Sequence, residues 1–210
     1  MGATVTGIDA VEKNIKIARL HPVYGFEDIV LSQGFLLVFE RIRIWIQQLK
    51  LLNTVVQQQR SLPLLLHIFC VKPINTAIAV LFEKLVEEQR KFDTVIALEV
   101  IEHVADVTEF CKSLSALTAH EGATVVSTIN RSMRSYATAI VAAEYLLQWL
   151  PKGTHQWSSF LTPEELTMIP KRAGVDVKEM AGFVYNPLTG RWSLLDDISV
   201  NLIAYGTKEK

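Results

Sequence analysis

The run Phe92–Leu98 constrains the fold of this chain more than any other stretch, because only Asp93 and Thr94 within it are polar. Strands that are nearly continuous hydrophobic runs are typical of parallel sheets covered on both faces. Parallel neighbours are joined by long crossover connections, which are usually helices. The run therefore predicts a strand in a parallel sheet with helices packed on both faces.

Strand and helix patterns alternate along much of the chain. Strand patterns occur at residues 3–8, 92–98, 123–128, 175–184 and 198–205. Apolar residues recur with the three- and four-residue spacing of a helix at residues 11–20 and 107–117. This alternation predicts a doubly wound α/β sandwich, and the 210 residues of the chain are enough for one such domain.

One further helix is signalled at both of its ends. Thr162 is a predicted N-cap, Pro163 suits the first helical position, and Glu165 completes a capping box. Gly174 is the expected stop after the last turn. Pro170 lacks a backbone N–H, which costs about 3 kcal/mol inside a helix, so a kink or an early end is expected there.

Charge, cysteine content and hydropathy exclude several classes of function. A formal net charge of -1 provides no field that would attract nucleic acid, so no nucleic-acid partner is expected. Cys70 and Cys111 lie far apart without CxxC spacing, which fits a reducing interior such as the cytosol or the mitochondrial matrix. Polar residues interrupt the most apolar stretch, residues 62–82, so no membrane-spanning segment of about 20 apolar residues is predicted.

Asp9 follows the first predicted strand, in the sequence Thr-Gly-Ile-Asp. Ligands of doubly wound folds bind at the carboxyl ends of the strands, where an acidic residue commonly accepts hydrogen bonds from ribose hydroxyls. An acidic residue after a strand also serves as a helix cap. Both interpretations of Asp9 stay open on the residues alone.

Glu99, Glu102 and His103 follow directly on the apolar strand. In a helix these positions, i, i+3 and i+4, share one face, so two carboxylates and an imidazole could converge on one hard cation. Carboxylates are also favourable at a solvated helix start, where exposed N–H groups attract negative charge. The place at the carboxyl edge of the sheet favours the metal site. Polar residues 127–132 leave the next strand at the same edge and could line a pocket there.

Residues 136–150 contain one charged residue, Glu144, and an aromatic end with Tyr145 and Trp149. At about 15 residues the segment is too short to span a bilayer, but it suits an interfacial or substrate-covering helix. A buried core helix is the alternative. In the loop that follows, His155 is either an exposed histidine or a candidate for acid-base catalysis.

Five segments of the chain carry a family resemblance. They are Gly-Ala-Thr-Val-Thr-Gly-Ile-Asp at 2–9, Leu-Glu-Val-Ile-Glu-His-Val at 98–104, Ser-Thr-Ile-Asn-Arg at 127–131, Pro-Lys-Gly-Thr-His at 151–155 and Tyr-Asn-Pro-Leu-Thr-Gly at 185–190. Together they resemble the ubiquinone-biosynthesis O-methyltransferases, particularly the mitochondrial, plant-type form. The similarity covers residues 1 to about 22 and about 81 to 210.

The resemblance implies a class I S-adenosylmethionine-dependent methyltransferase fold, a Rossmann-like α/β sandwich. Asp9 would then bind the ribose of the donor S-adenosylmethionine, and Leu98 would pack beside the donor. Glu99, Glu102 and His103 would be the ligands of Mg²⁺. The implied substrates are polyprenylated phenols with catechol-type hydroxyls. The implied place is the matrix side of the mitochondrial inner membrane, with the membrane surface and other quinone-biosynthesis proteins as partners.

Two departures from the family pattern lead to further expectations. The family places a first strand and a glycine-rich donor loop before the position of Met1, so the sandwich is expected to be incomplete. The missing strand would lie between the strands that end at Asp9 and Leu98. The expected gap predicts weak binding of the methyl donor, or none. Residues 1–9 show no signal-peptide or presequence pattern.

Residues 23–80 form the second departure, an unmatched insertion in a single domain of 210 residues. They are rich in Leu, Ile, Val, Phe and Gln, as a translated U-rich non-coding stretch would be, and only residues 42–52 form a convincing helical face. The alternative function is therefore a catalytically inactive fragment. Such a fragment would act as an interaction protein that docks on the membrane, or on other quinone-synthesis proteins, through its apolar segment at 136–150.

Overall fold

The computed structural model describes residues 4–9, 26–31, 64–68, 83–146, 152–153, 155–186 and 191–208. Its side chains are described within 83–146, 152–153, 155–184 and 193–208. The helices expected at residues 11–20 and 42–52 lie outside these residues.

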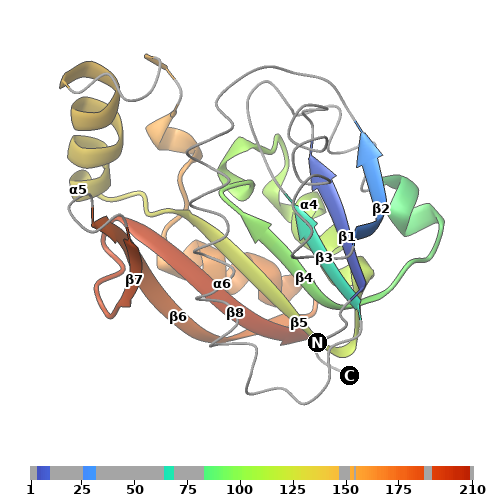
Figure 1. Cartoon of the computed structure of the whole chain (residues 1–210). Helices are drawn as coiled ribbons and strands as arrows, with labels where there is room; N and C mark the ends of the chain where they lie inside the picture. Colours follow the sequence, from blue (N-terminus) through green and yellow to red (C-terminus); the bar gives the residue numbers. More distant parts are fainter. Residues whose placement is uncertain are drawn as a thin grey trace.

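Within the described residues, eight strands form one mixed sheet in the order β2-β1-β3-β4-β5-β8-β6-β7 (Figure 1). The first five strands in this order pair in parallel, and the last three pair antiparallel. The strands are β1 Thr4–Asp9, β2 Phe26–Leu31, β3 Leu64–Ile68, β4 Phe92–Leu98, β5 Thr118–Ile129, β6 Val175–Asn186, β7 Arg191–Leu195 and β8 Asn201–Lys208. The predicted parallel sheet at Phe92–Leu98 is confirmed.

The helices described are short and connect the strands. They are η1 Ile101–His103, α4 Val107–Leu117, α5 Met133–Ser135, η2 Tyr136–Leu146, η3 Trp157–Ser159 and α6 Pro163–Arg172, with one further helical turn at 83–87. The helix predicted at 107–117 is confirmed at both ends, and Asp106 caps it by accepting hydrogen bonds from the N–H groups of Thr108 and Glu109.

Helix α6 begins as its sequence predicts, but it continues through Pro170 to Arg172, so the early end expected at Pro170 does not occur. The Thr162 side chain accepts a hydrogen bond from the Glu165 N–H, and the Glu165 carboxylate accepts one from the Thr162 N–H. Such a capping box stabilises a helix start by about 1 kcal/mol. The helix ends two residues after Pro170, and Gly174 follows with φ +87, the left-handed conformation that glycine adopts without strain.

Strand β3 overturns the expectation of a gap at the centre of the sheet. It pairs in parallel with β1, where Thr6 lies opposite Leu66, and with β4, where Leu66 lies opposite Val95. β2 also comes from residues 23–80, so this stretch supplies two strands. The gap was wrongly predicted because Leu-Leu-Leu-His-Ile is too short to show a period, whereas 42–52 shows a helical one.

The connections leave β1 and β3 in opposite directions. β1 leads to β2 on one side, and β3 leads to β4 on the other, although β1 and β3 are neighbours. In open α/β sheets, ligands bind outside the carboxyl ends of the strands where the connections diverge in this way. β1 ends there with Asp9, so the backbone of this residue lies at the end of a strand, as the sequence predicted.

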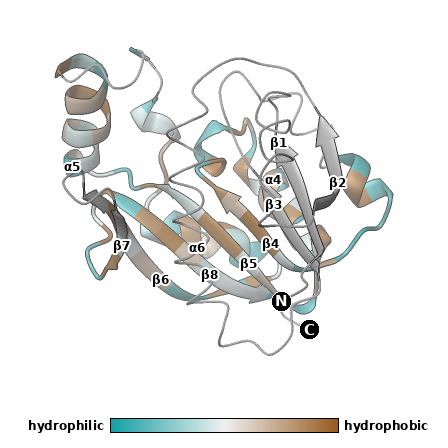
Figure 2. Cartoon of the chain, in the orientation of Figure 1, coloured by the Kyte–Doolittle hydropathy of each residue, from teal (hydrophilic) through white to brown (hydrophobic). Residues whose placement is uncertain are grey.

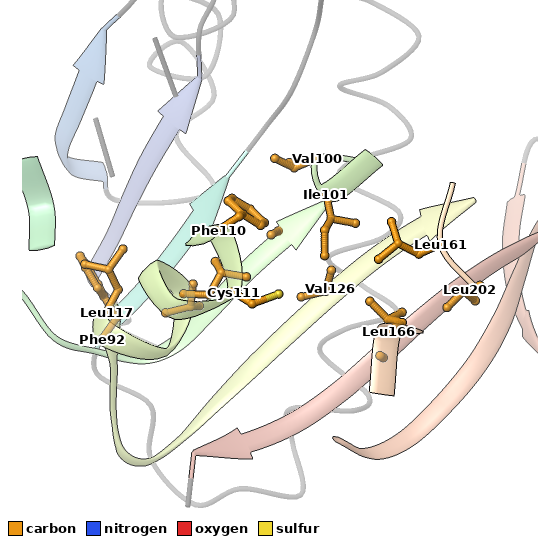
Figure 3. Packing of buried hydrophobic residues seen from close by; sticks show 14 of the residues in the cluster. Phe92, Val100, Ile101, Phe110, Cys111, Leu117, Val126, Leu161, Leu166 and Leu202 are labelled. Carbon is orange, nitrogen blue, oxygen red and sulfur yellow. The ribbon is translucent and has the colours of Figure 1, made fainter. Parts of the chain in front are cut away.

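The main hydrophobic core lies between the sheet and helices α4 and α6 (Figure 3). Leu114 and Leu117 of α4, Leu166 of α6 and Leu202 of β8 are almost completely buried. Burial of such side chains contributes about 1.5–3 kcal/mol each. Figure 2 shows hydrophobic residues along the middle strands of the sheet. Cys111 is a free thiol in this core, and burial raises its pKa to about 12.

Leu66→Pro tests the central position of β3, because it removes a backbone N–H from a strand with neighbours on both sides. We expect the free energy of unfolding to fall by about 1–3 kcal/mol. The melting temperature should fall by about 2–4 °C per kcal/mol. Thermal unfolding by circular dichroism measures this, with Leu66→Val as the control that keeps the N–H. Equal melting temperatures for the two variants would contradict the pairing of β3.

Candidate active site

Glu99 is the first residue after β4, and its backbone has φ +53. A non-glycine residue in this region is strained by about 1–3 kcal/mol, and such residues cluster at functional sites. Three hydrogen bonds with Ser127 of β5 hold it there, one of them from the Glu99 N–H to the Ser127 carbonyl at 3.2 Å. The Glu99 N–H donates to the Ser127 hydroxyl at 3.1 Å, and that hydroxyl donates to Oε1 of Glu99 at 2.8 Å. The Glu99 carboxylate is therefore tied to the next strand.

Glu102 lies in η1 with a buried side chain. Its Oε2 accepts a hydrogen bond from the Thr128 hydroxyl at 3.0 Å, and its Oε1 lies 3.9 Å from Nε2 of His103. A carboxylate taken out of water is tolerated only when hydrogen bonds or a cation compensate for the lost solvation. The Thr128 hydroxyl provides one such hydrogen bond, and the His103 imidazole would compensate by its charge only when protonated.

The convergence of Glu99, Glu102 and His103 on one cation is not seen in this structure. No group of three or more His, Cys, Asp or Glu side chains that could hold a metal ion occurs among the described residues. Glu99 precedes the helix, and η1 is a 3-10 helix, so the expected α-helical face does not form. As they stand, these residues do not fit a three-ligand site, and magnesium binding remains a prediction.

His155 reaches the same region from a distant part of the chain. Its ring stacks on that of His103 with centroids 6.3 Å apart, and the edge contact with Phe160 is at 5.9 Å. Its Nδ1 lies 3.0 Å from Oε1 of Glu144. The candidate acid-base residue is thus placed beside η1, at the carboxyl edge of β4.

Glu144 is the residue of this region that the sequence interpretation did not assign to the site. Its carboxylate is fully buried and accepts hydrogen bonds from the N–H groups of Gly153 at 2.6 Å and of His155 at 2.8 Å. A sequence signal existed, since Glu144 is the one charge in the apolar segment 136–150. Charged residues are rarely buried without partners, so a lone charge in such a segment points to a specific contact.

The polar residues 127–132 at the end of β5 mainly hold the structure together. Ser127 and Thr128 donate to the carboxylates of Glu99 and Glu102, and Asn130 donates to the Ile198 carbonyl at 2.8 Å. Arg131 pairs with Glu165 of α6, and the Ser132 side chain caps α5. The two hydroxyls of Ser127 and Thr128 hydrogen-bond to acidic side chains, and the lining of a pocket by residues 127–132 remains a prediction.

Helix η2 exposes apolar side chains on its outer side. The largest exposed fractions in α5 and η2 are 74% for Met133 and 73% for Leu146, and Tyr136, Val141 and Tyr145 are also exposed. The helix projects from the body of the molecule (Figure 1). Residues 147–151, including Trp149, lie outside the described residues. No helix in the described ranges is both long and apolar enough to cross a membrane.

The basic residues that flank η2 have acidic or aromatic partners. Arg131 pairs with Glu165, and Arg134 donates to Asp197 at 2.8 Å. Hydrogen bonds from the Ser199 hydroxyl and N–H, together with Arg134, lower the pKa of Asp197 to about 2. Nζ of Lys152 lies 5.3 Å from the centre of the Tyr145 ring. These contacts tie the base of η2 to the end of the sheet.

Leu98 is buried against Ile96 and Val125 in a small cluster of its own. It ends β4, which is the edge where a bound nucleoside would lie in a doubly wound sheet. Its role beside a donor remains a prediction, as does that of Asp9, whose side chain lies outside the described residues.

Comparison with known families identifies the domain. The family described as "Methyltransferase domain" matches residues 1–179 of the chain. The chain belongs to this methyltransferase family. Its fold is also similar to a solved S-adenosylmethionine-dependent methyltransferase of Thermotoga maritima, described as a possible histamine N-methyltransferase. That structure has a TM-score of 0.51 and 14% identity, with 100% of this chain and 83% of that chain covered, which bears on the fold alone.

Two curated relatives place this methyltransferase domain more closely. It is 55% identical over 213 residues to "Ubiquinone biosynthesis O-methyltransferase, mitochondrial" of Arabidopsis thaliana, covering 100% of this chain and 52% of that protein. It is 36% identical over 204 residues to "Ubiquinone biosynthesis O-methyltransferase" of Dinoroseobacter shibae, covering 97% of this chain and 64% of that protein. The predicted resemblance is confirmed. The domain thus spans about half the length of its Arabidopsis relative, and the treatment of residues 23–80 as an insertion remains a prediction.

Thr128→Val tests the hydrogen bond to Glu102 with little change of shape. We expect the free energy of unfolding to fall by about 1.5–3 kcal/mol, because the buried carboxylate loses a donor. Thr94→Val is the control: Thr94 is equally buried, but its hydroxyl has no hydrogen-bond partner in the described structure. Its replacement should leave stability unchanged or raise it. Chemical denaturation of both variants measures the difference, and equal losses would contradict the role of Thr128.

Proposed function

We propose that this chain is the catalytic domain of an S-adenosylmethionine-dependent O-methyltransferase of ubiquinone biosynthesis. The observation that carries the proposal is the 55% identity to the Arabidopsis relative across the whole chain. The substrates would be polyprenylated phenols with catechol-type hydroxyls, and the site of action would be the mitochondrion, as the name of that relative suggests.

Methyl transfer makes two demands on the protein. When bound, S-adenosylmethionine supplies an electrophilic methyl group on a sulfonium. The protein must hold a phenolic oxygen in line with that methyl group and must accept the phenolic proton. Asp9, at the carboxyl end of β1 beside the point where the connections diverge, suits hydrogen bonding to the donor ribose. Leu98 would form an apolar wall at the end of β4.

Calorimetry with S-adenosylmethionine tests this function on the purified chain. Because β3 fills the gap from which weak or absent donor binding was predicted, we now expect binding. We expect Asp9→Ala to weaken it about tenfold or more, because a hydrogen bond to a charged group contributes about 1.5–3 kcal/mol. Asp93→Ala is the matched control, since Asp93 stands at the opposite end of β4. Absence of binding by the parent chain would reject the enzyme and leave the alternative below.

Binding of Mg²⁺ by Glu99, Glu102 and His103 is a further proposal that rests on the family resemblance. Carboxylate and imidazole groups are suitable ligands, but here Ser127 and Thr128 hold the two carboxylates in separate hydrogen bonds. Binding by all three groups would require them to converge more closely than they do in this structure. Magnesium titration of the parent chain and of Glu102→Gln measures it. Equal affinities would reject this assignment.

We propose further that exposed apolar side chains of α5 and η2 dock on the mitochondrial inner membrane, from the matrix side. A head group must be reached without drawing its polyprenyl tail into water, and each CH₂ moved out of the bilayer costs about 0.8 kcal/mol. Met133, Tyr145 and Leu146 offer an apolar surface beside the candidate site. Other quinone-biosynthesis proteins could dock on the same surface.

Flotation with liposomes of inner-membrane composition tests this docking surface. Met133→Asp with Leu146→Asp should reduce the bound fraction more than tenfold, because each replaced side chain forfeits about 1.5–3 kcal/mol of apolar burial. The control is Met168→Asp, an exposed methionine on α6 with an exposed fraction of 53%. Flotation of the double variant at the level of the parent would reject the membrane surface as a partner.

The alternative function is an inactive interaction protein that uses the same η2 surface. An inactive interaction protein and an active methyltransferase would give the same flotation result, so flotation does not distinguish the two functions. Donor binding does, because only a methyltransferase needs an S-adenosylmethionine site.

A further inference from the structure

The connection from β7 to β8 crosses over β6. The two strands pair with opposite edges of β6. Leu195, the last residue of β7, and Leu202, near the start of β8, both lie opposite Gly182 of β6. Residues 196–200, which form the crossover loop, therefore pass over one face of β6 at Gly182.

Gly182 allows the crossover loop to lie directly on the strand. A Cβ at this position would lie 1.8 Å from the carbonyl oxygen of Asp197 and 2.7 Å from its carbonyl carbon. Non-bonded carbon atoms are most favourable about 3.5–4.0 Å apart, so a larger residue would push the loop away from β6. A glycine inside a strand often marks such a close approach of another backbone segment.

The crossover loop binds the chain that leads from β5 to α5 and η2. The Asn130 N–H donates to the Val200 carbonyl at 2.7 Å, and the Asn130 side-chain amide donates to the Ile198 carbonyl at 2.8 Å. The Ser132 hydroxyl donates to the Ser199 carbonyl. Three successive carbonyls of the loop thus accept hydrogen bonds from the residues just before α5.

Arg134 of α5 adds a contact from the helix itself. Its guanidinium donates to the Asp197 carboxylate at 2.8 Å and to the Ser199 hydroxyl at 2.7 Å. The Ser199 N–H donates to the other oxygen of the same carboxylate at 3.0 Å, which orients the carboxylate within the loop. Exposed ion pairs add little to the stability of a protein, so the main effect of this contact is to direct α5.

We infer that the crossover loop is the anchor that fixes the direction in which α5 and η2 leave the sheet, and that Gly182 is the positioning residue that makes this anchor possible. α5 and η2 rise from this end of the sheet (Figure 1). The inference goes beyond the proposed function, because an active methyltransferase and an inactive interaction protein would both depend on the direction of η2. Its test requires neither donor binding nor methyl transfer.

Other contacts hold η2 farther along its length. Ile140 packs with Ile129 and Phe160, and the buried Glu144 contacts His155. Loss of the anchor should therefore loosen the first turns of η2 and leave the rest of the fold in place. Amide hydrogen exchange at residues 135–142, measured by mass spectrometry on the 210-residue chain, reports this local opening.

Gly182→Ala displaces the crossover loop and should accelerate exchange at residues 135–142 by about tenfold or more. Gly206→Ala is the matched control. Gly206 lies in the neighbouring strand β8, and a Cβ there would lie 2.9 Å from the Val175 side chain and 3.0 Å from the Asp176 carbonyl oxygen, away from the loop. This control should lower the melting temperature but keep exchange at 135–142 within about twofold of the parent.

Arg134→Met tests the same anchor from the side of the helix and leaves the sheet untouched, because Arg134 is exposed. We expect exchange at residues 135–142 to rise about threefold or more. Arg134→Lys keeps a cation beside Asp197 and should restore part of the protection. A role of Arg134 in solubility alone would not produce this local change.

Either of two results would overturn the inference. Equal exchange at residues 135–142 in Gly182→Ala and Gly206→Ala would mean that Gly182 serves only the packing of the sheet. Exchange at the level of the parent in Arg134→Met would mean that the loop does not direct α5. If Gly182→Ala does not fold, the Arg134 variants decide the question alone.

Discussion

The backbone pairing of β3 between β1 and β4 is the interaction on which the rest of the structure depends. Every interior N–H and C=O of a central strand must be hydrogen-bonded, because an unsatisfied buried group costs about 1–3 kcal/mol and the stability of a whole domain is only about 5–15 kcal/mol. β3 meets this requirement for both of its neighbours. It joins the part of the sheet that carries Asp9 to the part that carries the candidate active site.

The register of β4 and β5 then determines the chemistry at the edge of the sheet. Leu98 lies opposite Ser127, so the residues that follow in each strand stand side by side. The Glu99 carboxylate accepts a hydrogen bond from the Ser127 hydroxyl, and the Glu102 carboxylate accepts one from the Thr128 hydroxyl. Each acidic side chain is hydrogen-bonded to a different hydroxyl of the neighbouring strand, although the sequence places the two only three residues apart.

Helix η2 links the membrane proposal to the chemical one. Its exposed side chains include Val141, Tyr145 and Leu146, whereas its Glu144 is buried and contacts His155. One element thereby presents apolar side chains to the surface and contacts the candidate acid-base residue. The proposed substrate, with a polar head and an apolar tail, would need both properties close together.

The sequence by itself determined the elements whose signals are local. The continuous apolar run at Phe92–Leu98, the spacing in α4 and the caps of α6 were sufficient to predict these elements, because each depends on residues a few positions apart. The acidic and histidine candidates were also found from the sequence. Only the tertiary structure decided that Leu64–Ile68 fills the centre of the sheet, that Glu99 turns to Ser127 and that Glu144 meets His155. A five-residue apolar run has no measurable period, and a hydrogen bond between distant segments depends on strand order and register, which no local pattern encodes.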